Sequence, residues 1–286
     1  TPFATVAELA SSATVDQGTG TLQIRVTPTG TTDVIFDSGP VTIESPRQFL
    51  WLIGDTPLIG GSPLRLYSLQ DSDSTQLVDV ETPALVRLLQ LSPDTPAVDL
   101  YVNDEMFEST PIFSNVAFGD LTAYADFPGV DTEVDFTPPG DTNVVLFEEE
   151  VDFALGLEQT YFLTGLSGNL SASVTSDNLR SVATEVRLRL IQGAPIISRV
   201  DVYLLEPGNT VTADSVPFLQ NLDPGVSSAF QSIEEGDYDV WLTAPDETTT
   251  VLGPRPITFV NGGVYTLALR NSDAGTSVQF LLINDQ

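Results

Sequence analysis

Val86-Arg-Leu-Leu-Gln-Leu-Ser-Pro-Asp-Thr-Pro-Ala-Val-Asp-Leu-Tyr-Val-Asn-Asp104 decides the fold, because this stretch opens a module that recurs along the chain. A related stretch runs from Val186 to Leu204, where Val186-Arg-Leu matches Val86-Arg-Leu and Asp201-Val-Tyr203 matches Asp99-Leu-Tyr101. The first copy of the module has no such opening stretch. We therefore expect two whole modules and a preceding one that lacks its first strands.

The repeat extends well beyond this stretch. The first copy aligns with residues 111–170 at an offset of 110, and the second and third copies align at an offset of about 106. The first alignment pairs Phe3 with Phe113, Val6 with Val116, Gly30 with Gly140, Val34 with Val144 and Val41 with Val151. The second pairs Asn115 with Asn221, Gly119 with Gly225, Tyr124 with Phe230 and Val134 with Val240.

These alignments predict three modules: an incomplete one at 1–82 and whole ones at 83–182 and 183–286. A solenoid is excluded, because its repeats run about 20–50 residues. By the first offset, the incomplete module lacks the counterpart of residues 85–110, which should form the first two strands of the second module.

The local pattern is β throughout. Thr21–Val26, Glu133–Phe136 and Tyr238–Leu242 alternate apolar with polar residues, as half-buried strands do. Asn261-Gly262 between two apolar runs predicts a hairpin, and only Thr5–Ser12 and Phe113–Leu121 leave room for a helical turn. About seven strands per module, with turn signals between them, predict an all-β chain of tandem immunoglobulin-like sandwiches.

The composition excludes several functions. The 286 residues carry 40 acidic and 10 basic side chains, a net charge of −30, so nucleic acid and anionic membranes should be repelled. No apolar run approaches the roughly 20 residues that span a bilayer, so we expect no membrane insertion. Cysteine and histidine are absent, which removes disulfides and the thiolate and imidazole ligands of metals. Such acidity favours a secreted, extracellular or cell-surface protein in screening salt.

The sequence resembles a known family. The stretch from Val86 to Val102, Phe113-Ser-Asn-Val-Ala-Phe-Gly-Asp120 and Glu133-Val-Asp-Phe-Thr-Pro138 resemble the modules of the bacterial and archaeal domain of unknown function 4397. The first copy is similar through Gln23-Ile-Arg-Val-Thr-Pro28. This resemblance implies tandem β-sandwich modules that are secreted or surface-anchored, and it implies no catalytic residues.

The missing strands allow two interpretations. Either this sequence begins inside a longer protein or its first copy has reorganised, or another subunit supplies the missing strand by β-strand addition. In the second case, self-association would involve strand edges and the apolar alternation of the first module. The expected interface residues are Leu22, Ile24, Val26, Phe49 and Trp51.

Candidate ligand sites are weak. Asp99 and Asp201 repeat beside a tyrosine, and Asp71 and Asp73 begin a segment like a calcium loop that lacks its glycine and glutamate. An aspartate that closes a turn is the more ordinary interpretation of the repeated pair. We expect no cofactor apart from loosely bound Ca²⁺.

The function predicted from the sequence is structural. No nucleophile elbow, phosphate loop or dinucleotide motif occurs in a suitable setting, and nothing places two carboxylates in a cleft, so we expect no enzyme and no catalytic residue. The first hypothesis is a subunit of a secreted or cell-surface assembly, including an extracellular filament joined by strand donation. The alternative is a monomeric adhesin or ligand-binding module that recognises a glycan or a protein.

Overall fold

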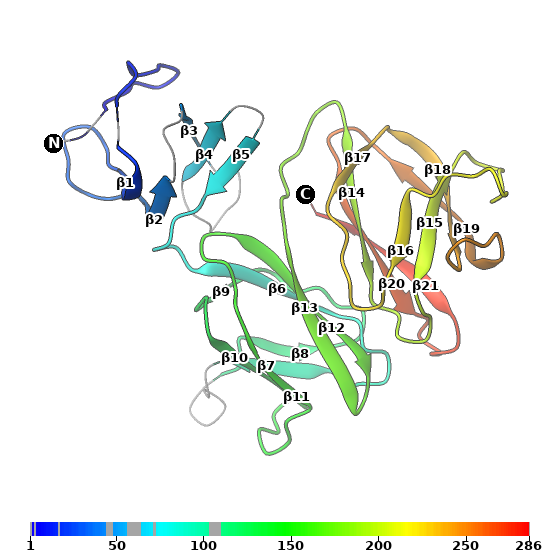
Figure 1. Ribbon diagram of the computed structural model, residues 1–286. Helices are drawn as coiled ribbons and strands as arrows, with labels where there is room; N and C mark the ends of the chain where they lie inside the picture. Colours follow the sequence, from blue (N-terminus) through cyan, green and yellow to red (C-terminus); the bar gives the residue numbers. More distant parts are fainter. Residues whose placement is uncertain are drawn as a thin grey trace. The chain divides into compact units, whose positions relative to one another are not determined.

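A computed structural model describes residues 2, 4–16, 18–43, 48–55, 64–70, 73–102 and 110–285. The chain forms two compact units. Unit 1 comprises residues 1–85, 126–129 and 154–157, and unit 2 comprises residues 86–125, 130–153 and 158–286. The strands of both are labelled in Figure 1. The division into three modules stays a prediction, since the second and third predicted modules pack within one unit.

Unit 1 contains two small antiparallel sheets. One pairs β1 (Gly20–Val26) with β2 (Phe36–Ile43), and the other has the order β3 (Leu50–Asp55), β4 (Leu64–Gln70), β5 (Asp73–Leu77). Ile24, Phe36 and Leu66 are buried together, and five partly buried apolar side chains pack against them. The core of unit 1 is therefore small.

The next eight strands form a four-on-four sandwich. One sheet has the order β13-β12-β6-β9 and the other β11-β10-β7-β8. Phe136 of one sheet packs against Tyr161 of the other with ring centroids 5.8 Å apart. The strands are β6 (Ala84–Gln90), β7 (Val98–Val102), β8 (Phe113–Val116), β9 (Ala125–Phe127), β10 (Thr132–Thr137), β11 (Phe147–Val151), β12 (Glu158–Leu166) and β13 (Asn169–Ser176).

The last eight strands repeat this arrangement, with sheets ordered β17-β14-β20-β21 and β16-β15-β18-β19. A cluster of fourteen buried apolar residues contributed by both sheets fills the interior. The strands are β14 (Val186–Gln192), β15 (Val200–Leu205), β16 (Leu219–Leu222), β17 (Gln231–Ile233), β18 (Gly236–Thr243), β19 (Thr250–Phe259), β20 (Val264–Asn271) and β21 (Val278–Asn284).

The predicted all-β class is confirmed, with sheets in a sandwich-like arrangement and no helix among the described residues. Within Phe113–Leu121, where a helical turn was considered, β8 occupies the start, and a single hydrogen-bonded turn from Ala117 to Asp120 follows it. The hairpin predicted at Asn261-Gly262 is wrong. β19 pairs with β18 and β20 pairs with β14, so this turn carries the chain from one sheet to the other. No helix in the described part of the chain is long and apolar enough to span a membrane.

The two sandwiches correspond with a shift that the sequence alignment missed. The backbone N–H of Leu91 donates to the carbonyl of Leu163, and that of Gly193 donates to the carbonyl of Leu269. These two bonds are equivalent, so Leu91 corresponds to Gly193. Two strand positions that the sequence alignment paired are therefore not equivalent, because Arg87 corresponds to Arg189 rather than to Arg187. The alignment was wrong by two residues. Val186-Arg-Leu-Arg-Leu190 alternates with a period of two, so a two-residue shift keeps every side chain on the same face.

Candidate assembly interface

Unit 1 has an incompletely paired strand in its first sheet. Among the described residues β1 pairs only with β2, whereas its counterpart β10 lies between β11 and β7. The β1–β2 pair has the same register as the β10–β11 pair. Leu22 lies opposite Val41, and Thr132, which is 110 residues further along, lies opposite Val151. The outer edge of β1 therefore lies where β7 pairs in the complete sandwich, and such an edge presents backbone N–H and C=O groups for another strand.

The second sheet of unit 1 is open in the corresponding way. β3 is an outer strand, whereas its counterpart β12 lies between β13 and β6. β6 runs parallel to β12, since the backbone N–H groups of Leu85 and Leu91 bond the carbonyls of Leu157 and Leu163. The described part of unit 1 thus lacks counterparts of two adjacent strands, one from each sheet.

The segment before β1, residues 4–16, 18 and 19, differs from its counterpart in the complete sandwich. By the offset of 110 these residues correspond to the region of β8 and β9, yet they form no strand. They contain a backbone hydrogen-bonded turn at Glu8-Leu9. Among the residues that the structure describes, β8 pairs only with β7, and β9 only with β6. With no counterparts of β6 and β7 beside them among the described residues, these residues have no ladder to join.

Apolar exposure follows the same pattern. Val6 is 43% exposed in unit 1, whereas its counterpart Val116 is 4% exposed in the complete sandwich. Ile53 of β3 is 43% exposed, whereas the counterpart strand β12 is buried from Glu158 to Thr164. Unit 1 therefore leaves in water side chains that its repeats bury, and each would gain roughly 1.5–3 kcal/mol on full burial.

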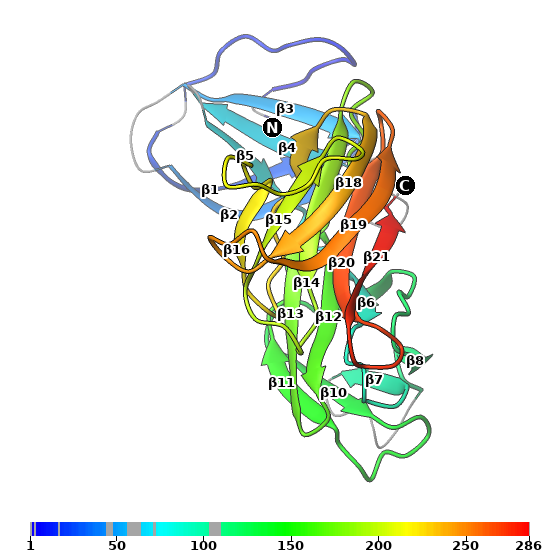
Figure 2. The ribbon, with the colours of Figure 1, turned by 90° about the vertical axis from the view of Figure 1, so that its right-hand side faces the viewer.

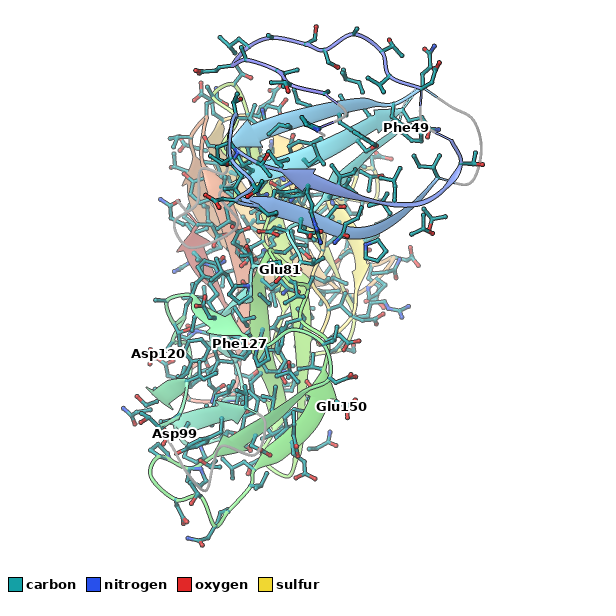
Figure 3. All side chains as sticks on the ribbon, turned by 90° about the vertical axis from the view of Figure 1, so that its left-hand side faces the viewer. Phe49, Glu81, Asp99, Asp120, Phe127 and Glu150 are labelled. Carbon is teal, nitrogen blue, oxygen red and sulfur yellow. The ribbon has the colours of Figure 1, made fainter. Side chains whose placement is uncertain are left out.

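The five predicted interface residues lie in two settings. Ile24 is buried in the small core of unit 1, and Leu22, Val26 and Trp51 pack at its margin. Phe49 is half-buried just before β3 (Figure 3). The most exposed apolar residues of the strand are instead Leu50, 59% exposed, and Leu52, 53% exposed. The sequence analysis missed them, although the inward position of Trp51 turns both neighbours outward.

A buried carboxylate organises the open sheet. Asp37 accepts hydrogen bonds from Gln23 Nε2 at 2.7 Å, from Arg25 Nε at 2.7 Å and from the Gly39 backbone N–H at 2.9 Å. Burial alone would raise the pKa of Asp37, but the Gly39 bond and the two cross-strand partners bring this pKa below its ordinary value. The ionised carboxylate thus holds β1 against β2.

The densest group of buried charges lies in unit 2, between the two sandwiches. Arg87 Nη2 approaches Asp285 Oδ1 at 2.6 Å, and Arg189 Nη2 approaches Asp177 Oδ1 at 2.5 Å. Each arginine also donates to a threonine of its own sandwich, Arg87 to Thr160 at 2.9 Å and Arg189 to Thr266 at 2.7 Å. All four charged side chains are almost fully buried.

This cluster is nearly symmetric, because each arginine reaches the aspartate of the other sandwich. The Arg87 guanidinium lies 5.0 Å from the Tyr124 ring, and that of Arg189 lies 4.7 Å from Phe230, the residue aligned with Tyr124. Burial would lower the pKa of Arg87, but Asp177 and Asp285 raise it above its ordinary value. Arg87 therefore stays charged, and the ion pairs of both arginines hold the sandwiches together.

An apolar contact completes this junction between the two sandwiches, whose strands are labelled in Figure 2. Leu89, Leu91 and Phe162 of the first sandwich pack with Ile191 and Ala268 of the second. Gly193 allows the close approach, since a Cβ there would lie 2.2 Å from Leu91 Cδ1. The sequence analysis missed this junction. The available signal was that Arg87 and Arg189 occupy apolar strands in a chain with only ten basic residues.

The comparison with family models gives a match in the middle of the chain. Residues 84–203 match the family described as Domain of unknown function (DUF4397). The match runs from β6 into β15, and the resemblance expected from the sequence is confirmed over these residues. The comparison with curated proteins gave no match.

Within the DUF4397 stretch, the repeated aspartates close turns. Asp99, labelled in Figure 3, accepts backbone N–H bonds from Asn115 at 2.7 Å and Gly140 at 2.9 Å. Asp201 accepts them from Asn221 at 2.8 Å and Asp246 at 3.2 Å. Both oxygens of each carboxylate are thus engaged with backbone donors, and this arrangement favours a structural role over calcium binding.

The other two calcium candidates, Asp71 and Asp73, do not form a described cation site. Asp71 lies outside the described residues, and Asp73 begins β5. Among the described side chains, no group of three or more acidic residues is placed to hold a metal ion. The predicted loose binding of Ca²⁺ therefore stays a prediction.

Proposed function

We propose that this protein is a structural subunit of a secreted or cell-surface assembly, and that its subunits join by β-strand addition at the open edges of unit 1. The observation that carries the proposal is the edge of β1. It is unpaired among the described residues, whereas its counterpart β10 is paired on both sides at the same register. A strand placed there would restore the arrangement that the chain itself uses twice.

Energetics support strand addition as the means of association. Main-chain hydrogen bonds at a sheet edge provide affinity, and pockets for alternate side chains provide specificity. In unit 1 the incoming strand would cover Val6, Leu50, Leu52 and Ile53, which are exposed in the single chain. An edge of this kind is an aggregation hazard unless a partner covers it.

The acidic composition supports an extracellular setting. Copies that carry a net charge of −30 repel one another, and salt near 1 M shortens the Debye length to about 3 Å. Association through uncharged strand edges then becomes favourable. A contact between two different surfaces that does not close on itself produces an open filament. In this proposal, tandem immunoglobulin-like sandwiches form the body of each filament subunit.

Electron microscopy and sedimentation of the full chain in saline buffer test this proposal. Wild-type protein is expected to form fibres, and Leu52→Asp is expected to abolish them by adding a charge to the open edge. Val144→Asp is the matched control, since Val144 is 44% exposed and lies outside every strand. Wild-type protein that stays monomeric at all concentrations, or equal assembly by both variants, would overturn the proposal and favour a monomeric adhesin.

A further inference from the structure

Most outer strands of the two sandwiches carry features that block pairing. β8, β9, β16 and β17 are only three or four residues long. β11 presents Glu148-Glu149-Glu150, and β19 contains Pro254 and Pro256. Short strands, charges and prolines at an edge prevent uncontrolled pairing with other chains. The fold therefore protects edges that need no partner.

Among the strands that the structure describes, three outer ones lack this protection. One of them, β13, lies against the second sandwich, where Ser173 donates its hydroxyl to the carbonyl of Gly225. The other two are β3 and β21. β3 reads Leu50-Trp-Leu-Ile-Gly-Asp55, and β21 reads Val278-Gln-Phe-Leu-Leu-Ile-Asn284. β21 has no charged residue and no proline, β3 has a charge only at its last residue, and their lengths are six and seven residues. In a chain with a net charge of −30, such uncharged strands are where two copies can approach with the least repulsion.

β21 also has an open edge. It pairs with β20 on one side and with no other strand among the described residues. Its Leu282 is 42% exposed, beside a shallow groove lined by Arg255, Pro256, Ile257, Thr258, Phe280 and Leu282. This groove can receive an apolar side chain from an adjoining strand.

We infer that the β21 edge of one copy receives the β3 edge of a second copy, so that β21 takes the place that β6 has beside β12. This inference rests on the proposed function and names its donor strand. The two edges belong to different units of the chain, so the contact is heterologous and can repeat from one copy to the next. The sheet of four strands that ends at β21 would continue into the three strands that begin at β3.

Cysteine cross-linking of the full chain tests this pairing, because the chain contains no cysteine of its own. Leu282→Cys is combined with Leu50→Cys or with Leu52→Cys, since neighbouring strands bring Cα atoms within the roughly 4.4–6.8 Å that a disulfide needs. After mild oxidation, at least one double variant is expected to give a ladder of trimers and larger species on a non-reducing gel. Each single variant is expected to stop at the dimer.

The control pair combines Leu52→Cys with Val144→Cys, two equally accessible positions that the inference keeps apart. An equal ladder from the control pair overturns the inference. Fibres without any cross-link also overturn it and assign the donor to another strand, while leaving the proposed function intact. The absence of both fibres and cross-links shows instead that the proposed function has failed.

Discussion

Replacement of Arg189 by methionine tests the charged junction of unit 2 most directly. Arg189 is 1% exposed and forms an ion pair with Asp177 at 2.5 Å. The variant keeps the length of the side chain but removes the charge. Removal of one partner from a buried ion pair costs about 3–5 kcal/mol, because the other charge stays buried.

The structure places the cost near the lower end of this range. Asp177 keeps a second ion pair, with Arg87 Nε at 3.2 Å, and hydrogen bonds from Tyr124 and Thr160. We therefore expect a loss of about 3 kcal/mol in the free energy of unfolding. For a unit of this size, such a loss lowers the melting temperature by roughly 6–12 °C.

Tryptophan fluorescence can follow unit 2 alone. The chain has two tryptophans, Trp51 in unit 1 and Trp241 in unit 2, so a Trp51→Phe background leaves only the second reporter. The control is Arg199→Met, which breaks the half-exposed pair with Asp223 and should leave the melting temperature unchanged. If Arg189→Met melts at the temperature of Arg199→Met, the junction does not stabilise unit 2 and the reasoning is refuted.

Two further predictions concern single sites. Because the folded pKa of Asp37 lies below its ordinary value of 3.8, its carboxylate stabilises unit 1 fully above about pH 4 and progressively less as pH falls towards the folded pKa. Asp37→Asn should lower stability at neutral pH and flatten this acid-side loss, as measured by Trp51 fluorescence in a Trp241→Phe background; an unchanged profile would contradict it. Gly193→Ala should cost about 1–3 kcal/mol by overpacking the junction, whereas Gly54→Ala, with nothing within 4 Å of its Cβ, should cost far less in thermal unfolding; equal costs would contradict it.

Local patterns predicted the strands well. The predicted strands Thr21–Val26 and Tyr238–Leu242 lie in β1 and β18. The pleat of a strand points successive side chains to opposite faces, so alternation of apolar and polar residues is a local signal that the sequence carries. The failed hairpin at Asn261-Gly262 shows the limit of such patterns. The turn chemistry was correct, since Gly262 has a φ of +83°, but a tight turn does not determine which sheet the next strand joins.

Long-range contacts lay beyond the sequence analysis. Arg87 and Asp285 are 198 residues apart, and nothing local distinguishes Asp285 from the other acidic residues. The repeat predicted that the first copy lacks strands, and this stays a prediction; among the described residues, β1 and β3 are outer strands of their sheets. It could not show that Ile24 and Trp51 serve the core while Leu50 and Leu52 face outward.

The ion pairs between the two sandwiches of unit 2 are arranged like those of an isologous homodimer. Each half offers the same face, with an arginine for the partner's aspartate, and residues 178–185 tie the halves into one polypeptide. A tether of this kind replaces a concentration-dependent equilibrium by an effective concentration of about millimolar order. The pair therefore stays intact under any dilution, and the outer surfaces of the two halves are free to diverge while the shared face is kept.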